Sequence, residues 1–141
     1  RAEYYQRLAN ISAQGDWTGW IKFFLRAVVQ QAETNLRRVR RIMALYEETK
    51  ANIREITHSQ HGQQLLDGIF DRPIFNAADF SQRTGINKQT LQGLLRQLTK
   101  DTGPLIVLQE GQGRRPSIYA FPQLLNICEG RDLFPTTQQQ N

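Results

Sequence analysis

The chain has 141 residues, a formal net charge of +5 at pH 7 and one cysteine. This length accommodates one ordinary domain or two small ones, and the single cysteine excludes an internal disulfide and a cysteine-based zinc site. With no signal peptide and no apolar run long enough to cross a membrane, we expect a cytoplasmic protein. The positive charge mildly favours an anionic partner.

The first part of the chain is predicted to be helical. Apolar residues recur at helical spacing over residues 3–11, and Gly15 ends that helix. Asp16 is a suitable N-cap for a second helix, whose apolar stripe continues over residues 17–53 with no glycine after Gly19. An unbroken helix of this kind approaches ~60 Å. It is too long to bury its whole stripe within this chain, so we expect a missing domain or a second copy to cover it.

A basic run at residues 37–41 lies on this long helix and has two interpretations. It could contact nucleic-acid phosphates, but a solvated helix face is the more common outcome, with Glu33 and Arg37 at the favourable i,i+4 spacing. Four aromatic residues near the helix start are expected to pack rather than to line a ligand pocket; these are Trp17, Trp20, Phe23 and Phe24.

The polar segment 57–62 follows the long helix and predicts a hinge. His58 and His61 lie in it three residues apart, but no third ligand is near, so we expect no metal site. Cys128, among leucines and an isoleucine near the C-terminus, is expected to be a small buried residue.

Residues 62–134 predict a winged helix-turn-helix. Asn76 and Asn87 are suitable N-caps, and Gly85 supplies the turn between the two helices they begin. The predicted elements, in chain order, are a helix over 63–71, a short strand at 74–75, helices over 76–84 and 87–100, and strands over 105–108 and 117–121. Such a module usually binds DNA or another protein.

The second helix of this module has a buried and an exposed face. Leu91, Leu94, Leu95 and Leu98 recur at helical spacing and are predicted to face the core. Gly93 costs about 1 kcal/mol in a helix interior relative to alanine, and its absent side chain would let a phosphate backbone or another chain approach. The predicted contact surface for DNA or a protein comprises Lys88, Gln89, Gln92, Gly93, Arg96, Lys100, Arg114 and Arg115.

The charge of the module is modest for a dedicated DNA reader. Residues 76–121 hold six Lys/Arg against three Asp/Glu, whereas residues 1–61 hold ten against six. DNA-binding domains often carry more positive charge than this, which weakens the nucleic-acid interpretation without removing it.

The N-terminal helices resemble the closing helices of Fic-family proteins. The residues that carry the resemblance are Tyr4-Tyr5-Gln6-Arg7-Leu8, Gly15-Asp16-Trp17 and Trp20-Ile21-Lys22-Phe23-Phe24-Leu25. In that family a long helix and a winged helix-turn-helix commonly follow, so the resemblance extends over nearly the whole chain. It implies a parent protein that transfers AMP from ATP to a protein hydroxyl, with Mg²⁺.

The active-site motif of that family, His-Pro-Phe-x-x-Gly-Asn-Gly-Arg, is absent from this chain. The segment 110–114 imitates its end, but no His-Pro-Phe precedes it and its setting predicts the turn of the wing. We therefore assign no catalytic residue, metal ligand or cofactor to this chain. Because the chain opens on a charged residue without methionine, we expect a fragment whose catalytic motif lies upstream.

The expected fold is mainly α: helices of a Fic-like domain and a long linker helix over 1–61, a winged helix-turn-helix with a small β-wing over 62–134, and a disordered tail over 135–141. The function we favour is that of a non-catalytic C-terminal regulatory or binding part of a Fic-family protein, whose winged helix contacts DNA or protein. The alternatives are a DNA-binding transcriptional regulator, and a module for dimerisation through the long helix or for docking a target protein.

Overall fold

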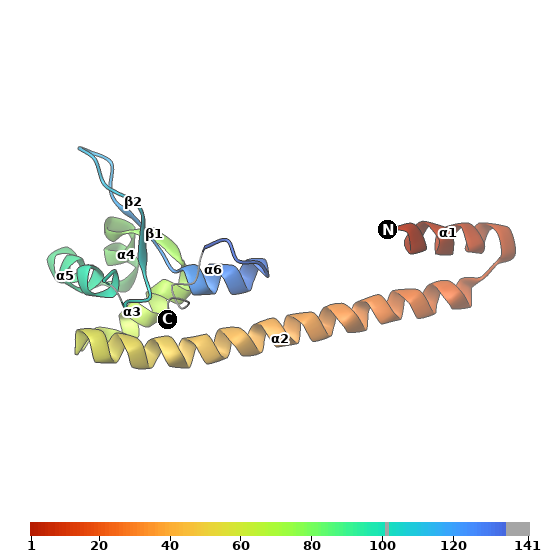
Figure 1. The fold of residues 1–141 in the computed structure, drawn as a ribbon, viewed down its shortest axis with the longest axis horizontal. Coiled ribbons are helices and arrows are strands. Elements are labelled where there is room, and N and C mark those ends of the chain that lie inside the picture. Colours follow the sequence, from red (N-terminus) through yellow and green to blue (C-terminus); the bar gives the residue numbers. More distant parts are fainter. Residues whose placement is uncertain (101, 135–141) are drawn as a thin grey trace, which may run out of the picture. The chain divides into compact units, whose positions relative to one another are not determined.

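A computed structural model describes residues 1–100 and 102–134. The chain is mainly helical with one small antiparallel sheet, as the sequence predicts (Figure 1). The elements are α1 (Ala2–Gln14), α2 (Trp17–Thr57), α3 (Gly62–Asp71), β1 (Ile74–Asn76), α4 (Ala77–Thr84), α5 (Lys88–Leu98), β2 (Ile106–Gln109), β3 (Ile118–Ala120) and α6 (Pro122–Glu129). The chain divides into two compact units, Arg1–Val39 and Arg40–Asn141. The tail predicted to be disordered lies outside the described residues.

The first unit contains α1 and the beginning of α2. Gly15 ends α1 with φ 65°, and its N–H donates to the Ile11 carbonyl over 2.9 Å. The Asp16 carboxylate accepts the Gly19 N–H at 2.9 Å, so it caps α2 as predicted. α2 then continues without interruption for 41 residues.

The apolar surface of this first unit is largely uncovered. The aromatic residues divide into two pairs: Trp20 and Phe23 are half-buried, whereas Trp17 is 61% and Phe24 is 55% exposed. Packing within the chain was therefore correctly predicted only for Trp20 and Phe23. The exposed aliphatic residues of α2 in this unit are Ile21, Leu25, Val28, Val29, Leu36 and Val39.

Glu33 and Arg37, which have the favourable i,i+4 spacing, are not among the salt bridges of the described residues. The guanidinium of Arg37 instead donates to the Thr34 hydroxyl at 3.1 Å, and the Thr34 hydroxyl itself donates to the Gln30 carbonyl. A partner three residues away is closer to the guanidinium than the carboxylate of Glu33, and both groups stay solvated. The basic run remains on an exposed part of the helix.

The second unit is a winged helix-turn-helix whose sheet has the order β1-β3-β2. β1 and β2 pair antiparallel to β3, with Ile74 and Ile106 both opposite Ala120. β2 begins one residue later than the predicted strand because the Leu105 N–H donates to the Leu98 carbonyl at 3.1 Å. Leu105 therefore closes the end of α5 instead of joining the sheet.

The core of the winged unit includes the second half of α2. Leu45, Thr49 and Ile53 are its buried residues, and the Tyr46 hydroxyl donates to the Asp67 carboxylate of α3 at 2.7 Å. That hydrogen bond raises the pKa of Tyr46 above its usual range. The other buried apolar residues come from every element of the unit except β2: Leu65, Leu66, Ile69, Phe75, Phe80, Ile86, Leu91, Leu94, Leu95, Leu98, Leu105, Ala120, Phe121, Leu124 and Ile127.

Two predictions need correction at the ends of helices. α5 ends at Leu98 rather than near Lys100, and the Thr99 hydroxyl donates back to the Leu95 carbonyl at 2.9 Å. Cys128 is exposed, not buried. Ile127 faces the core, and a side chain one residue further along a helix points about 100° away. Cys128 therefore lies on the solvent side of the last turn of α6.

The segment between α2 and α3 is a tight turn. His58 has φ 46°, in the left-handed region that few side chains adopt. The Ser59 N–H donates to the Thr57 hydroxyl, and the His61 ring lies 2.6 Å from the Gln64 amide oxygen.

No helix within residues 1–100 and 102–134 has the length and hydropathy to span a membrane.

Candidate nucleic-acid interface

α5 lies on the core of the winged unit with its leucines inward. Asn87 begins the helix, and its side-chain oxygen accepts the Gln89 N–H at 2.9 Å. All four predicted core residues are buried, namely Leu91, Leu94, Leu95 and Leu98. This burial fixes the opposite face of α5 toward solvent.

The solvent face of α5 carries polar and basic side chains around Gly93, which has no side chain. Gln89, Gln92 and Arg96 are exposed, and a Cβ added at Gly93 would meet no atom within 4 Å. Lys88 is exposed at the first turn of the helix. Lys100 is exposed as well, but it lies two residues beyond the end of α5.

The tip of the wing is a closed turn. Gln112 and Arg115 exchange two backbone hydrogen bonds of 3.0 and 3.1 Å. Gly113 has φ 59° between them, whereas Arg114 has a negative φ, the combination found in a type II′ hairpin turn. A glycine is needed at this first central position because it tolerates positive φ.

A second contact holds the base of the wing loop. The Gly111 N–H donates to the Ser117 hydroxyl at 2.9 Å. The loop is therefore closed at its tip, between Gln112 and Arg115, and at its base, between Gly111 and Ser117. The exposed Arg114 and Arg115 lie in this closed tip. The sequence did not indicate this role of Ser117, since a serine beside a strand has no specific signature.

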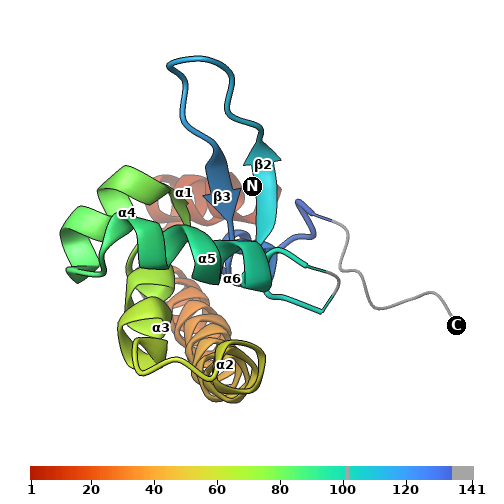
Figure 2. The same cartoon turned by 90° about the vertical axis from the view of Figure 1, so that its left-hand side faces the viewer.

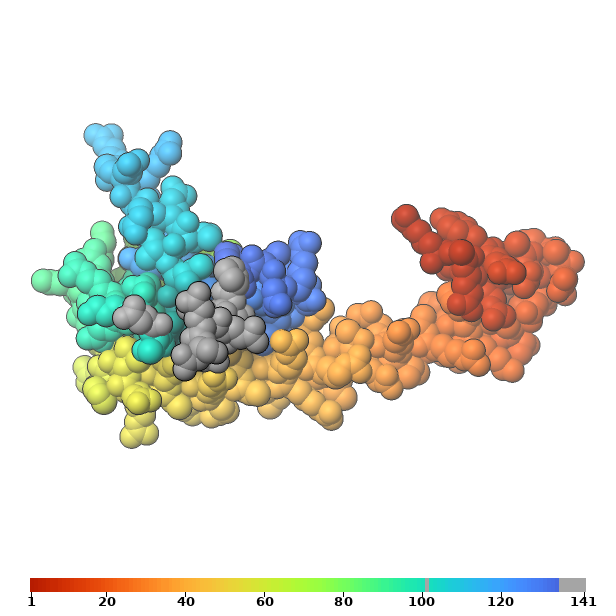
Figure 3. Space-filling view, viewed as in Figure 1, coloured from red at the N-terminus to blue at the C-terminus, as the bar shows by residue number. Residues whose placement is uncertain are grey.

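α5 and the wing lie on the same side of the winged unit (Figure 2). The wing protrudes beyond the body of the unit (Figure 3). Among the described residues, no salt bridge involves the cations of this surface, Lys88, Arg96, Arg114 and Arg115. Glu110 is the only acidic residue described within α5 or the loop between β2 and β3. These described elements therefore carry more positive than negative charge.

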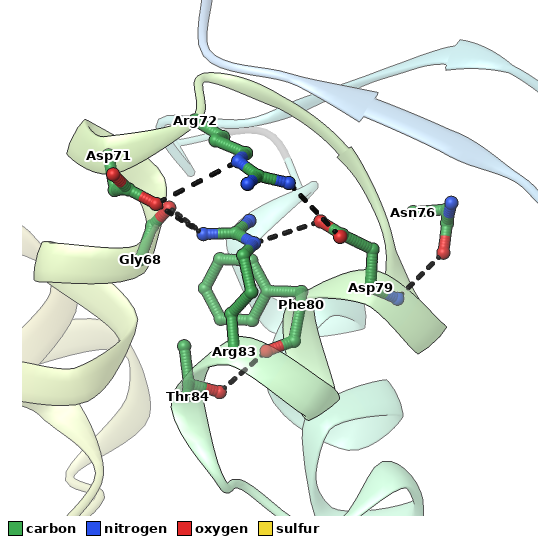
Figure 4. Close-up of polar contacts among 8 residues, drawn as sticks. All are labelled: Gly68, Asp71, Arg72, Asn76, Asp79, Phe80, Arg83 and Thr84. Carbon is green, nitrogen blue, oxygen red and sulfur yellow. Dashed lines mark hydrogen bonds and ion pairs between the residues drawn. The ribbon is translucent and has the colours of Figure 1, made fainter.

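The helix that precedes α5 is held by an ion-pair cluster (Figure 4). The guanidinium of Arg83 pairs with Asp79 of its own helix and with Asp71 of α3, each at 2.9 Å. It also lies 5.3 Å from the centroid of the Phe80 ring. Because this side chain joins α3 to α4, the cluster positions the helix-turn-helix. The spacing of Asp79 and Arg83 is visible in the sequence, but the pairing with Asp71 depends on the fold.

A shallow pocket of about 280 Å³ lies beside this cluster. Its lining residues are Gln64, Asp67, Gly68, Asp71, Arg83 and Thr84. The Arg83 charge there is already compensated by two carboxylates, and the Asp67 carboxylate accepts hydrogen bonds from Tyr46 and Gln63. These groups are committed to holding α2, α3 and α4 together, so the pocket has a structural role.

Of the eight residues predicted as a contact surface, five lie on α5, two lie at the wing tip, and Lys100 lies just beyond the end of α5. The fold brings them to one side of the winged unit.

Among the described residues, no group of three or more His, Cys, Asp or Glu side chains is arranged to hold a metal ion. Comparison of the sequence with profiles of known protein families finds no match.

Proposed function

We propose that the winged unit binds a nucleic-acid duplex through α5 and the wing. The observation that carries this proposal is a set of four cations, Lys88, Arg96, Arg114 and Arg115, that form no salt bridge with another described residue. They lie on two elements of the same side, near the open position of Gly93. Phosphate contacts supply most of the affinity of such an interface, and the closest backbone approach needs a small residue.

We further propose that the chain is the C-terminal, non-catalytic part of a cytoplasmic Fic-type protein. Its parent would transfer AMP from ATP to protein hydroxyls with Mg²⁺, and the winged unit would regulate or localise that activity. Two observations support this proposal. Residues 4–25 resemble the closing helices of that family, and the same helices expose an apolar face of the kind that an adjoining catalytic part would cover.

Replacing Arg114 and Arg115 together with alanine tests the duplex proposal. We expect duplex affinity to fall roughly 10- to 100-fold at moderate salt, because two charge-assisted contacts to phosphates are lost. The slope of log affinity against log salt should also become shallower by about two. Fluorescence anisotropy with a labelled duplex measures both quantities.

The matched control replaces Lys50 and Arg131, two exposed cations of the same unit that lie outside α5 and the wing. This control removes the same net charge, so it separates a local contact from a general charge effect. Equal affinities of the two double variants would contradict the proposed interface.

The second candidate is contact with another polypeptide through α2. It is favoured by the apolar face of the first unit, where Ile21, Leu25 and Val28 are each about half exposed. A second copy is one occupant of that face. Light scattering over a range of concentrations separates the occupants, since a chain that stays monomeric at high concentration has no self-association through α2.

A further inference from the structure

We propose that α5 enters the major groove and discriminates bases, with Gln89 and Gln92 binding adenines and Arg96 binding a guanine. This inference rests on the proposed function, because it names what the same interface recognises. It divides the exposed residues into those that select sequence and those that only hold the duplex.

The three side chains lie on the exposed face of α5. The buried leucines define the inner face. Gln89 and Arg96 lie opposite them and Gln92 lies on the shoulder of the exposed face, with spacings of three and four residues between the three side chains. Their separation along the helix axis is about 10.5 Å at 1.5 Å per residue. This length corresponds to about three base steps of 3.4 Å, so a helix aligned with the groove reaches a run of about four base pairs.

The chemistry of these groups matches the purine edges. The glutamine carboxamide presents an N–H donor beside a carbonyl acceptor, and this pair fits N7 and the N6 amino group of adenine, whereas the arginine fork donates twice to O6 and N7 of guanine. Within the described residues, no hydrogen bond uses the side chain of Gln89, Gln92 or Arg96. By contrast, the side-chain oxygen of Asn87 is occupied by the helix cap.

The position of Gly93 supports close approach. It lies opposite the buried leucines, beside Gln89 and Arg96, and the space where its Cβ would be is open. A helix whose backbone can come near the floor of the groove lets side chains as short as glutamine reach base edges. The cations at the border of the interface, Lys88 and the two wing arginines, then contact phosphates, which position the protein without selecting sequence.

Selection from a pool of randomised duplexes tests the inference. The wild-type chain should enrich sequences with two adenines and one guanine within about four base pairs. Each of the two variants Gln89→Ala and Gln92→Ala should abolish the preference for adenine at one position. Discrimination at that position should fall roughly tenfold. The dependence of affinity on salt should stay unchanged, because no phosphate contact is removed.

Gln97→Ala is the control, since Gln97 is an exposed glutamine of the same helix that lies on the other shoulder of the exposed face, about 140° around the helix axis from Gln92. It should leave every base preference intact. All three replaced side chains are exposed, so the variants are expected to fold, and circular dichroism of each variant checks this.

The outcomes separate the inference from the proposed function. If the chain binds duplexes but shows no base preference, or if Gln89→Ala and Gln92→Ala keep the wild-type preferences, the inference is overturned and the proposed function stands. If no duplex binds even at low salt, both are overturned.

Discussion

Replacing Phe80 with alanine is expected to lower the free energy of unfolding of the winged unit by about 3–5 kcal/mol, a large part of the stability of a small domain. The Phe80 side chain is fully buried, and its ring lies 4.5 Å from the ring of Phe75. It also packs against Gly68, where an added Cβ would lie 2.6 Å from the Phe80 ring. The truncation therefore leaves a cavity between α3, α4 and β1 that these neighbours cannot fill without moving.

Urea unfolding followed by the NMR signals of the winged unit measures this change. Tryptophan fluorescence would not report on it, because both tryptophans lie in the other unit. Phe24→Ala is the control, since Phe24 is 55% exposed and should change stability by less than about 0.5 kcal/mol. A loss below about 1 kcal/mol for Phe80→Ala would contradict the packing described for α4.

Replacing Ile53 with alanine should cost the winged unit about 2–5 kcal/mol. Ile53 is 1% exposed, although it lies on α2, upstream of the three helices of the helix-turn-helix. The prediction follows from the assignment of residues from Arg40 onward to the winged unit. The same urea experiment measures it.

Met43→Ala is the control for that variant. Met43 is on the same helix and in the same unit but is 65% exposed, so its loss should change stability by no more than about 0.5 kcal/mol. If Ile53→Ala behaves like Met43→Ala, α2 is a separate linker rather than part of the winged core.

The fold of the winged unit was largely predictable because its signals are local. Two asparagine caps and one glycine with positive φ determine where α4 and α5 begin and where α4 ends, and each lies at the predicted residue. The four leucines of α5 also indicated the buried face correctly. These features depend on residues within one or two helical turns.

Features that depend on tertiary contacts were not predictable in the same way. The buried face of α2 is one example, because Thr49 is a polar residue that became part of the core. Cys128 is another, since its apolar neighbours suggested burial and the rotation of α6 determined its exposure. The pairing of Arg83 with Asp71 joins residues 12 apart, and no periodic pattern indicates it.

The exposure of the residues of the candidate site was predictable from the sequence, but their arrangement into one surface was not. Helical spacing placed Gln89, Gly93 and Arg96 opposite the leucines of α5 with Gln92 on the shoulder, and all four residues are exposed in the structure. Where the wing lies relative to α5 depends on how β2 and β3 join the sheet. The closure of the base of the wing loop depends on the Gly111–Ser117 hydrogen bond.

Mapping of backbone amide shifts on addition of a duplex is the direct test of the proposed interface. We expect the largest shifts on residues 88–96 and 111–116, with residues 1–39 unchanged. Shifts confined to residues 1–39, or no shifts at low salt with a duplex in excess, would contradict the assignment of α5 and the wing as a nucleic-acid interface.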